Sequence, residues 1–562
     1  MKEKTVDGSW WRCNVSLVLL SFLILSIFFS YDMGNRPFAD PDEGRYVEIS
    51  REMLETGDYV TPRLNGLKYF EKPPLFYWMQ ALSMKIFGLN EVSMRLWVVF
   101  FAILGCMSVF FVGSRYHSNR VGLMSAGILA TNVLYYVHSR LILLDLVVSV
   151  LISGALWCFY VAFVQEKHDP PWEKYWIVAM YALSALACLA KGLIGVVLPA
   201  LVALLWLTLT GSIRKIWKIL DPSGIMVFLI IFLPWHILMG GRNGDFLHFY
   251  FVVEHFLRYT TTVHCRHQPV WFFIPVLLLG FLPWTGFALV ALKRAVQKSI
   301  NGKNSENIFF LCWIFGILGF FSCSNSKLMP YILPVTQPIA LLTSVSMSEY
   351  FHAKREDFRN AVWINVGLFF AVSLTYLLAK NKLGVAWDGP EMNVLINTMF
   401  LLMWIMAVIW LFAVYSKILK LSCLLCTFFL SANMMWIVNK AAVFFQETTK
   451  PSTKRFAEII KLNKNDGDLI FCYKRYYQDF PVYLRSTVKV VDFVGELEFG
   501  ANAEKNNGKL ISNDDFWALW KTARERIFLL MSRDNYREVF RTANLSHKVL
   551  DFNRYFIVII NR

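Results

Sequence analysis

The chain has 562 residues, of which 56% are hydrophobic, 16% aromatic and only 17% charged. This composition excludes an ordinary soluble domain, in which about 25% of residues are charged, and indicates a membrane protein. The formal net charge is +16, and because the basic residues follow a topological pattern, described below, a nucleic-acid partner is not needed to explain it.

Apolar windows recur from the N-terminus to residue 440. A helix needs about 20 mostly apolar residues to cross about 30 Å of hydrocarbon, and we predict thirteen such spans. The first, 14–31, follows basic residues but lacks a small-residue cleavage site, so we interpret it as a retained span. The others centre on 98–112, 121–137, 141–163, 175–190, 193–209, 225–239, 270–292, 309–321, 331–347, 362–378, 395–414 and 421–438.

The positions of Lys and Arg orient these spans, because basic residues accumulate in cytoplasmic loops. With the N-terminus in the cytoplasm, each predicted cytoplasmic loop carries two to four basic residues, and the main exception to this pattern is the pair Lys380 and Lys382 on the exterior side. Thirteen spans then place the C-terminus outside. We therefore expect a polytopic α-helical membrane protein, and the family resemblance given below implies that its membrane is a bacterial inner (plasma) membrane.

Two exterior segments are longer than simple turns. The first, 32–90, predicts two short amphipathic helices, 43–56 and 74–87, at the membrane surface. The second, 240–269, is rich in aromatic residues and His. Its motif HCRH at 264–267 is compatible with metal binding or with solvated loop histidines, and Cys265 could pair with Cys472 in an oxidising compartment.

The composition becomes polar from residue 447. The segment 454–463 predicts a helix, and the runs LIFCY, VKVVDF, RIFLLMS, HKVLDF and YFIVIIN predict strands, with helices at DFWALWKTA and NYREVF between them. We expect a transmembrane domain over 1–440, which includes the exterior loops 32–90 and 240–269, and a small periplasmic α/β domain over 447–562 that packs or recognises without catalysing.

Ionisable residues gather on one side of this topology. Such groups cost about 2.5 to 3.5 kcal/mol within a span, so they mark function more often than loop residues do. The exterior positions are Asp40, Asp42, Glu43, Arg45, Tyr69, Glu71, Lys72, Asp145, Lys191, Glu254, His255, Arg258, Lys327 and Tyr331. They predict a cavity open to the exterior leaflet, with carboxylates at a reacting centre and cations for an anionic lipid headgroup. A transporter would instead place polar groups near the middle of the membrane.

Structural roles are open for several of these residues. Asp40 or Asp42 suits the N-cap of the helix predicted to begin near Glu43. Asp145 could neutralise Arg140. An ordinary interfacial position is the alternative for Lys72, Lys191 and Lys327.

Five motifs occur in order along the chain: ADPDEGRY, YFEKPPLFYW, RLILLDL, AKGLIGVVLP and SKLMPYILP. Together they resemble the polyprenyl-phosphate-dependent glycosyltransferases of the GT-C fold. Within that group the chain is most similar to the lipid A 4-amino-4-deoxy-L-arabinose transferases, which are related to protein O-mannosyltransferases. DEGRY and EKPP are the stretches most specific for the aminoarabinose branch, and the resemblance covers nearly the whole chain.

The resemblance implies roles for individual residues. Asp42 corresponds to the catalytic carboxylate of the first exterior loop, and Asp145 to a second functional acid. Glu71 corresponds to a carboxylate that can bind a divalent metal, Zn or Mg, and no other cofactor is implied. Donor phosphate or lipid binding is expected for Arg45, Tyr46, Tyr69, Lys72, Arg258 and Tyr331, to which we add Lys191 and Lys327 from their exterior position and charge.

The implied reaction moves the aminosugar from undecaprenyl phosphate to a lipid A phosphate at the periplasmic face and confers resistance to polymyxin and cationic peptides. Attack opposite the leaving phosphate predicts inversion, for which one carboxylate is enough. Asp42 would accept a proton from a hydroxyl acceptor, or stabilise positive charge at the anomeric carbon if the acceptor is an ionised phosphate.

The expected partners are the polyprenyl-phosphate sugar, membrane lipids and an acceptor, which is lipid A or another lipid or protein. We expect a monomer. The alternatives are a related transferase with another sugar or a protein acceptor, and a lipid transporter or flippase.

Overall fold

The computed structural model describes residues 15–165, 170–257, 267–302, 304–350, 355–380, 389–415, 420–504, 508–542 and 545–561. The chain forms two compact units. The first comprises Met1–Tyr31, Val98–Pro234 and Phe251–Ala442, and the second comprises Asp32–Trp97, Trp235–Tyr250 and Val443–Arg562. The second unit thus contains the whole predicted first exterior loop, 32–90, together with the C-terminal region. The predicted division near residue 440 follows the chain and stays a prediction.

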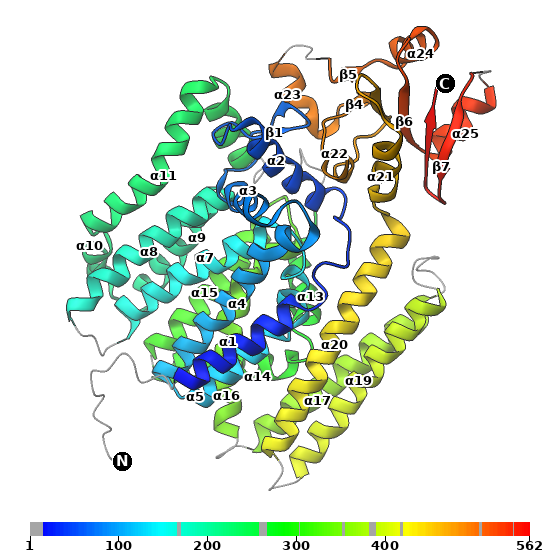
Figure 1. The fold of residues 1–562 in the computed structure, drawn as a ribbon. Coiled ribbons are helices and arrows are strands. Elements are labelled where there is room, and N and C mark those ends of the chain that lie inside the picture. The colour runs from blue at the N-terminus through cyan, green and yellow to red at the C-terminus, as the bar shows by residue number, and fades with distance from the viewer. Residues whose placement is uncertain are drawn as a thin grey trace. The chain divides into compact units, whose positions relative to one another are not determined.

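The first unit is helical (Figure 1). Its described elements, some of which extend beyond the unit, are α1 (Val15–Ser30), α4 (Glu91–Tyr116), α5 (Asn119–Ala130), α6 (Val133–His138), α7 (Leu144–Phe159), η1 (Tyr160–Val164), α8 (Pro170–Lys191), α9 (Ile194–Leu209), η2 (Ile213–Lys215), α10 (Ile216–Ile219), α11 (Pro222–Arg242), η3 (His248–Leu257), η4 (Val270–Phe272), α13 (Phe273–Gly280), α14 (Thr285–Gly302), α15 (Ser305–Cys323), η5 (Met329–Val335), α16 (Thr336–Tyr350), α17 (Arg355–Ala379), α19 (Pro390–Tyr415) and α20 (Lys420–Thr449).

Eight helices within the described residues are long and apolar enough to cross a membrane, or nine if the bent pair Val270–Gly280 and Thr285–Gly302 is one span. Helices α1 and α9 are apolar but have only 16 residues each. The predicted span 121–137 is divided where Asn132 caps α6. The structure therefore supports a multi-pass helical membrane protein but does not confirm the count of thirteen spans.

Helices α7 and α8 form the hairpin that positions part of the candidate site. They pack against each other along their length (Figure 1), and they run antiparallel, since Asp145 at the start of α7 bonds Lys191 at the end of α8. The span formed by α7 and η1 is the most enclosed of the candidates, with 94% of its apolar window buried. Its last turn, η1, is a π-helix, a variant that often occurs at functional sites.

The second unit contains the two helices predicted in the first exterior loop. They are α2 (Asp42–Thr56) and α3 (Leu75–Phe87), so both predictions are confirmed within one residue. The chain leaves α2 through Gly57, whose φ of 71° is the left-handed conformation that glycine adopts readily. Between the helices lies a hairpin of β1 (Arg63–Leu64) and β2 (Leu67–Lys68).

The C-terminal part of this unit is a six-stranded sheet of order β5-β4-β3-β6-β8-β7. Strands β3 (Leu469–Tyr473), β4 (Lys489–Val491), β5 (Leu510–Ile511) and β6 (Ile527–Ser532) are parallel, whereas β7 (Lys548–Phe552) and β8 (Phe556–Ile560) are antiparallel. The run IFLLMS is almost wholly buried, as expected of a parallel strand covered on both faces.

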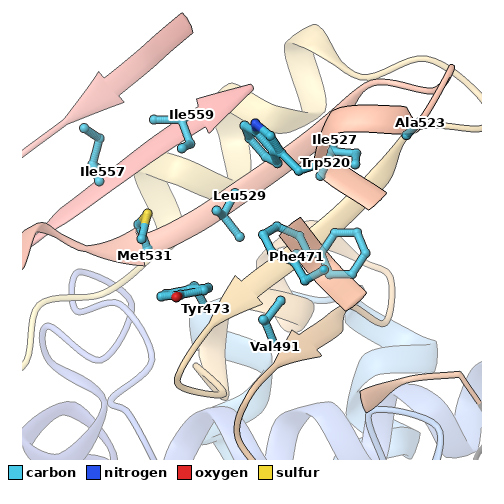
Figure 2. Packing of buried hydrophobic residues seen from close by; sticks show 11 residues of the cluster. Phe471, Tyr473, Val491, Trp520, Ala523, Ile527, Leu529, Met531, Ile557 and Ile559 are labelled. Carbon is cyan, nitrogen blue, oxygen red and sulfur yellow. The ribbon is translucent and has the colours of Figure 1, made fainter. Parts of the chain in front are cut away.

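The core of the sheet lies beneath α24 (Asn513–Thr522) and α25 (Arg533–Thr542). Figure 2 shows Trp520 of α24 near Leu529, with Phe471 and Val491 from the neighbouring strands. On the other face, Phe556 contacts Phe456 of α21 (Lys454–Asn463) and Tyr477. The predicted strands and helices of this region are confirmed, but β5, α22 (Asp479–Leu484) and α23 (Glu498–Ala503) were not predicted, since they are too short to carry a periodic signal.

Candidate functional site

Arg45 lies at the centre of an acidic and phenolic group in the second unit. Its guanidinium donates to Asp42 Oδ1 over 3.1 Å and pairs with Glu496 Oε2 at 2.5 Å. The Asp42 side chain is 50% exposed, whereas those of Arg45 and Glu496 are 15% exposed. The Arg45 cluster, as we name it, consists of Asp42, Arg45, Tyr46, Tyr69, Glu71, Tyr77 and Glu496.

Two buried phenols complete this cluster. The hydroxyls of Tyr69 and Tyr77 have no hydrogen-bond partner among the described residues, and burial raises the pKa of both phenols, so they stay neutral donors. A buried hydroxyl without a partner costs about 1–3 kcal/mol. Both groups are therefore suited to donate to polar atoms of a substrate.

The helix that carries Asp42 and Arg45 is fixed by its first turn. Glu43 is 1% exposed, accepts the Ala39 N–H over 2.8 Å, and pairs with Arg36 at 2.7 Å and Arg95 at 2.8 Å. Next to it, a Cβ on Gly44 would lie 2.5 Å from the backbone N of Asp479. In the motif DEGRY, Glu43 and Gly44 thus hold the helix in place, and Asp42 and Arg45 face the cluster.

Asp40 has a structural role different from the predicted one. The residue preceding α2 is Pro41, and the structure gives this helix no side-chain cap. Asp40 instead accepts the Gln478 N–H over 3.0 Å and pairs with Arg475 at 2.8 Å. The capping prediction for Asp40 is therefore wrong, because its carboxylate faces the C-terminal region and not the end of its own helix.

Lys72 adjoins the Arg45 cluster through Glu71. Lys72 Nζ donates to the Glu71 carbonyl over 2.8 Å and lies 3.9 Å from Glu71 Oε2. In the part of the chain that is described, no group of three His, Cys, Asp or Glu side chains is arranged to hold a metal. His264 and Cys265 lie outside the described residues, so the metal role of Glu71 and the pairing of Cys265 stay predictions.

A second group lies in the first unit, at one end of the α7–α8 hairpin. Lys191 donates to Asp145, and its ammonium stands 4.6 Å from the centre of the Tyr331 ring. Three segments far apart in sequence therefore meet here. Arg140 donates to the carbonyls of Phe29 and Tyr31 over 2.6 Å each. We name Asp145, Lys191 and Tyr331, with His138, the Asp145 cluster.

Lys327 is held by backbone carbonyls in the same unit. It is 4% exposed, and its Nζ donates to Gln268 O over 2.9 Å and to Ser324 O over 2.5 Å. These bonds fix the loop before η5. Lys327 therefore has a structural role that an ordinary lysine at the membrane boundary lacks. Arg258, the remaining predicted phosphate ligand, lies outside the described residues.

Sequence reasoning missed three members of these groups, Tyr77, Glu496 and His138, of which Tyr77 lies within the motif YFEKPPLFYW. Glu496 follows the parallel strand β4, and since ligands bind beyond the carboxyl ends of parallel strands, its position was a usable signal. His138 interacts electrostatically with Asp145 and Lys191, and its Nδ1 lies 2.7 Å from the Leu134 carbonyl. Nothing in the local sequence distinguishes His138 from an interfacial histidine.

Comparisons with known proteins agree with this architecture. Residues 14–292 match the family model described as dolichyl-phosphate-mannose-protein mannosyltransferase, and residues 456–561 match the aminoarabinose transferase C-terminal domain. An undecaprenyl phosphate-alpha-4-amino-4-deoxy-L-arabinose arabinosyl transferase from Yersinia pestis is 30% identical over 68% of each chain. One of the same name from Aeromonas hydrophila is 27% identical over 91% of this chain and 93% of its own.

Solved structures give the same result. The crystal structure of ArnT from Cupriavidus metallidurans bound to undecaprenyl phosphate aligns over 98% of both chains, with a TM-score of 0.82 and 27% identity. An archaeal oligosaccharyltransferase from Archaeoglobus fulgidus has a TM-score of 0.52 at 11% identity and is similar in fold alone. The chain belongs to the family of undecaprenyl phosphate-alpha-4-amino-4-deoxy-L-arabinose arabinosyl transferases, which are glycosyltransferases of the GT-C fold.

Proposed function

We propose that the protein transfers 4-amino-4-deoxy-L-arabinose from undecaprenyl phosphate to a lipid A phosphate. The observation that carries this proposal is the similarity along 98% of the chain to a transferase bound to undecaprenyl phosphate. The product carries an added amine, which lowers the negative charge of the membrane surface. Cationic peptides such as polymyxin are then attracted less strongly, so the activity confers resistance to them.

The charge of the Arg45 cluster suits the sugar. Three carboxylates, those of Asp42, Glu71 and Glu496, outnumber the cations of Arg45 and neighbouring Lys72. Such a site favours the ammonium of an aminosugar and the positive charge that grows at the anomeric carbon in the transition state. Asp42 is the half-exposed member, so we assign it the direct contact with the reacting sugar, oriented by Arg45.

The leaving polyprenyl phosphate needs cations. Lys191, held by Asp145 and Tyr331, supplies one, and Lys72, Arg45, Lys327 and Arg258 are its proposed companions, with Tyr46 and Tyr69 beside the donor. Arg and Lys are the usual phosphate-binding side chains. We propose that the transfer inverts the configuration of the sugar and takes place at the periplasmic face of the inner membrane, in a monomer.

The experiment is transfer in vitro from the defined aminoarabinosyl donor to lipid A by the purified chain. Asp42→Asn should lower kcat/KM by at least about 100-fold, since placed acid–base or charge-stabilising groups contribute that much. The control is Glu55→Gln, which removes another acid of α2 that is 54% exposed and pairs with Arg51. Unchanged turnover by Asp42→Asn would refute the assignment.

Two further experiments vary the sugar of the donor and the metal content of the transfer assay. Transfer from a polyprenyl-phosphate hexose in preference to the aminoarabinosyl donor would favour the alternative of another sugar. A chelator that stops transfer, with recovery on adding Zn or Mg, would support the metal role of Glu71, and Glu71→Gln should then lose the response to metal.

A further inference from the structure

A polar cavity lies in the first unit at the opposite end of the α7–α8 hairpin from the Asp145 cluster. Its volume is about 1060 Å³, and it is lined by the end of η1, the start of α8, the end of α9, η2 and α10, the end of α14 and the start of α15. Asp145 starts α7, and Val164 ends η1 at the cavity. At about 1.5 Å per residue, the helix between them spans roughly the 30 Å of a hydrocarbon core.

The cavity offers cations and hydroxyls together. Lys215 and Lys218 line it, and its acidic lining residue is Glu173, which lies 3.5 Å from Lys218. Lys215 Nζ donates to Phe163 O over 3.1 Å, a bond that uses one of its three donors. The hydroxyls of Thr208, Thr210 and Ser299 donate to carbonyls of their own helices, so Ser212 and Ser305 supply the hydroxyl donors of the lining. The described lining residues thus carry one net positive charge together with donors for phosphate oxygens.

The rim of the cavity is apolar and exposed. Leu209 and Ile300 line it and are 69% and 74% exposed. Trp217, beside Lys218, is 78% exposed, and tryptophan is enriched where a protein meets the membrane–water interface. A ligand with an anionic head and apolar chains matches this arrangement, whereas a soluble anion would leave the rim uncovered.

We propose that this cavity binds the phosphodiester headgroup of an anionic phospholipid from the leaflet opposite the Asp145 cluster. A phosphodiester carries one negative charge, which balances the net charge of the lining. Its oxygens would accept from Lys215, Lys218, Ser212 and Ser305, and its acyl chains would cover Leu209 and Ile300. The site is separate from the transfer reaction, and the proposal does not depend on the proposed function.

The test is native mass spectrometry of the full chain, released from nanodiscs that contain equal amounts of phosphatidylglycerol and phosphatidylethanolamine. Wild type should retain phosphatidylglycerol preferentially. A basic residue near an anionic membrane is worth about 1 kcal/mol, so Lys215→Gln should lower that preference about fivefold, and the double variant with Lys218→Gln roughly 30-fold. Lys215→Arg with Lys218→Arg should keep it.

The matched control is Arg214→Gln, which removes a cation from the same 3₁₀ turn but is not in the lining. Equal loss of lipid in Arg214→Gln, or equal retention of both lipids by wild type, would refute the site. A separate arm adds inorganic phosphate to lipid-free protein in detergent. Binding of phosphate there, lost in the double variant and unaffected by phosphatidylglycerol, would assign the cavity to a soluble anion and overturn the lipid proposal.

Discussion

At the scale of residues, the ion pair between Arg45 and Glu496 shows that the short motif DEGRY does not by itself supply all the charged groups of the Arg45 cluster. Arg45 contacts Asp42 three residues before it and Glu496 more than four hundred residues after it. The first contact follows from helical spacing. The second depends on how the C-terminal region folds, so the sequence predicted Arg45 as a site residue but not its main acidic partner.

A double-mutant cycle should expose this pairing. Removing one partner of a buried ion pair costs about 3–5 kcal/mol, because the other charge stays buried and unpaired. We expect Arg45→Gln and Glu496→Gln each to lower the thermal unfolding midpoint of the purified protein, and the double variant to be more stable than the sum of the two changes predicts. The expected coupling is about 0.5–3 kcal/mol. Strict additivity would contradict the pairing.

At the scale of elements, α2 carries a second acidic group one to three turns after Asp42. Glu48, Arg51 and Glu52 are all at most 4% exposed. Arg51 donates to both oxygens of Glu48, over 2.7 and 2.6 Å, and Glu52 accepts the Gly66 N–H over 2.9 Å. Burial, with the neighbouring charge of Glu48, raises the pKa of Glu52 to about 8, so Glu52 is protonated at neutral pH.

This protonation predicts how stability depends on pH. The unfolded carboxyl loses its proton near pH 4.3, whereas the folded one keeps it until about pH 8. The unfolded state therefore binds fewer protons between these values, and the contribution of Glu52 to stability falls as pH rises through this window.

Glu52→Gln copies the protonated form without a titrating group. This variant should remove the loss of stability with rising pH. Its thermal unfolding midpoint at pH 8 should therefore be a few degrees higher than that of wild type, at about 2–4 °C per kcal/mol of stability recovered. The measurement is the midpoint of the purified protein from pH 5 to pH 8.5. Glu55→Gln, on the same helix but 54% exposed, should keep the slope of wild type. A Glu52→Gln protein with an unchanged slope would contradict the prediction.

The elements also show which parts of the fold the sequence predicts and which parts it does not. Helices α2 and α3 and the strands β3, β6 and β8 were predicted because each has a clear periodic or apolar run. The predicted span 121–137 is equally apolar but is interrupted at Asn132, whose side chain accepts the Tyr135 N–H over 2.9 Å. A single capping residue thus divides an apolar window that hydropathy alone predicts to be one continuous helix.

At the scale of the whole molecule, the number of spans decides on which side the C-terminal region lies. The charge pattern predicts an odd number with a cytoplasmic N-terminus. Alkaline phosphatase fused after residue 562 should therefore be active, and a green fluorescent protein fused there should be dark, since the first works only outside the cytoplasm and the second only inside. The reverse should hold for fusions within the predicted cytoplasmic loop near Lys167. A fluorescent C-terminal fusion would require an even number of spans.

The one-sided distribution of ionisable residues was the most informative sequence signal at this scale. It predicted that Asp145, Lys191 and Tyr331 would meet, and the structure brings these three together. The distribution alone did not separate side chains that face a substrate from those that fix the fold. Structural capping roles were predicted for Asp40 and Glu43 from their place near the start of the helix, and the structure gives both a structural role through other partners. That distinction depends on partners from distant segments, which local sequence does not specify.

The position of Glu496 has a consequence for the synthesis of the protein. The ribosome makes Asp42 and Arg45 long before it makes Glu496, which lies more than four hundred residues further along the chain. Until the C-terminal region has folded, a nascent chain lacks the acidic partner that fixes the orientation of Arg45. We therefore expect a chain that terminates before Glu496 to insert most of its helices yet to be inactive, so that it would not consume the lipid-linked sugar.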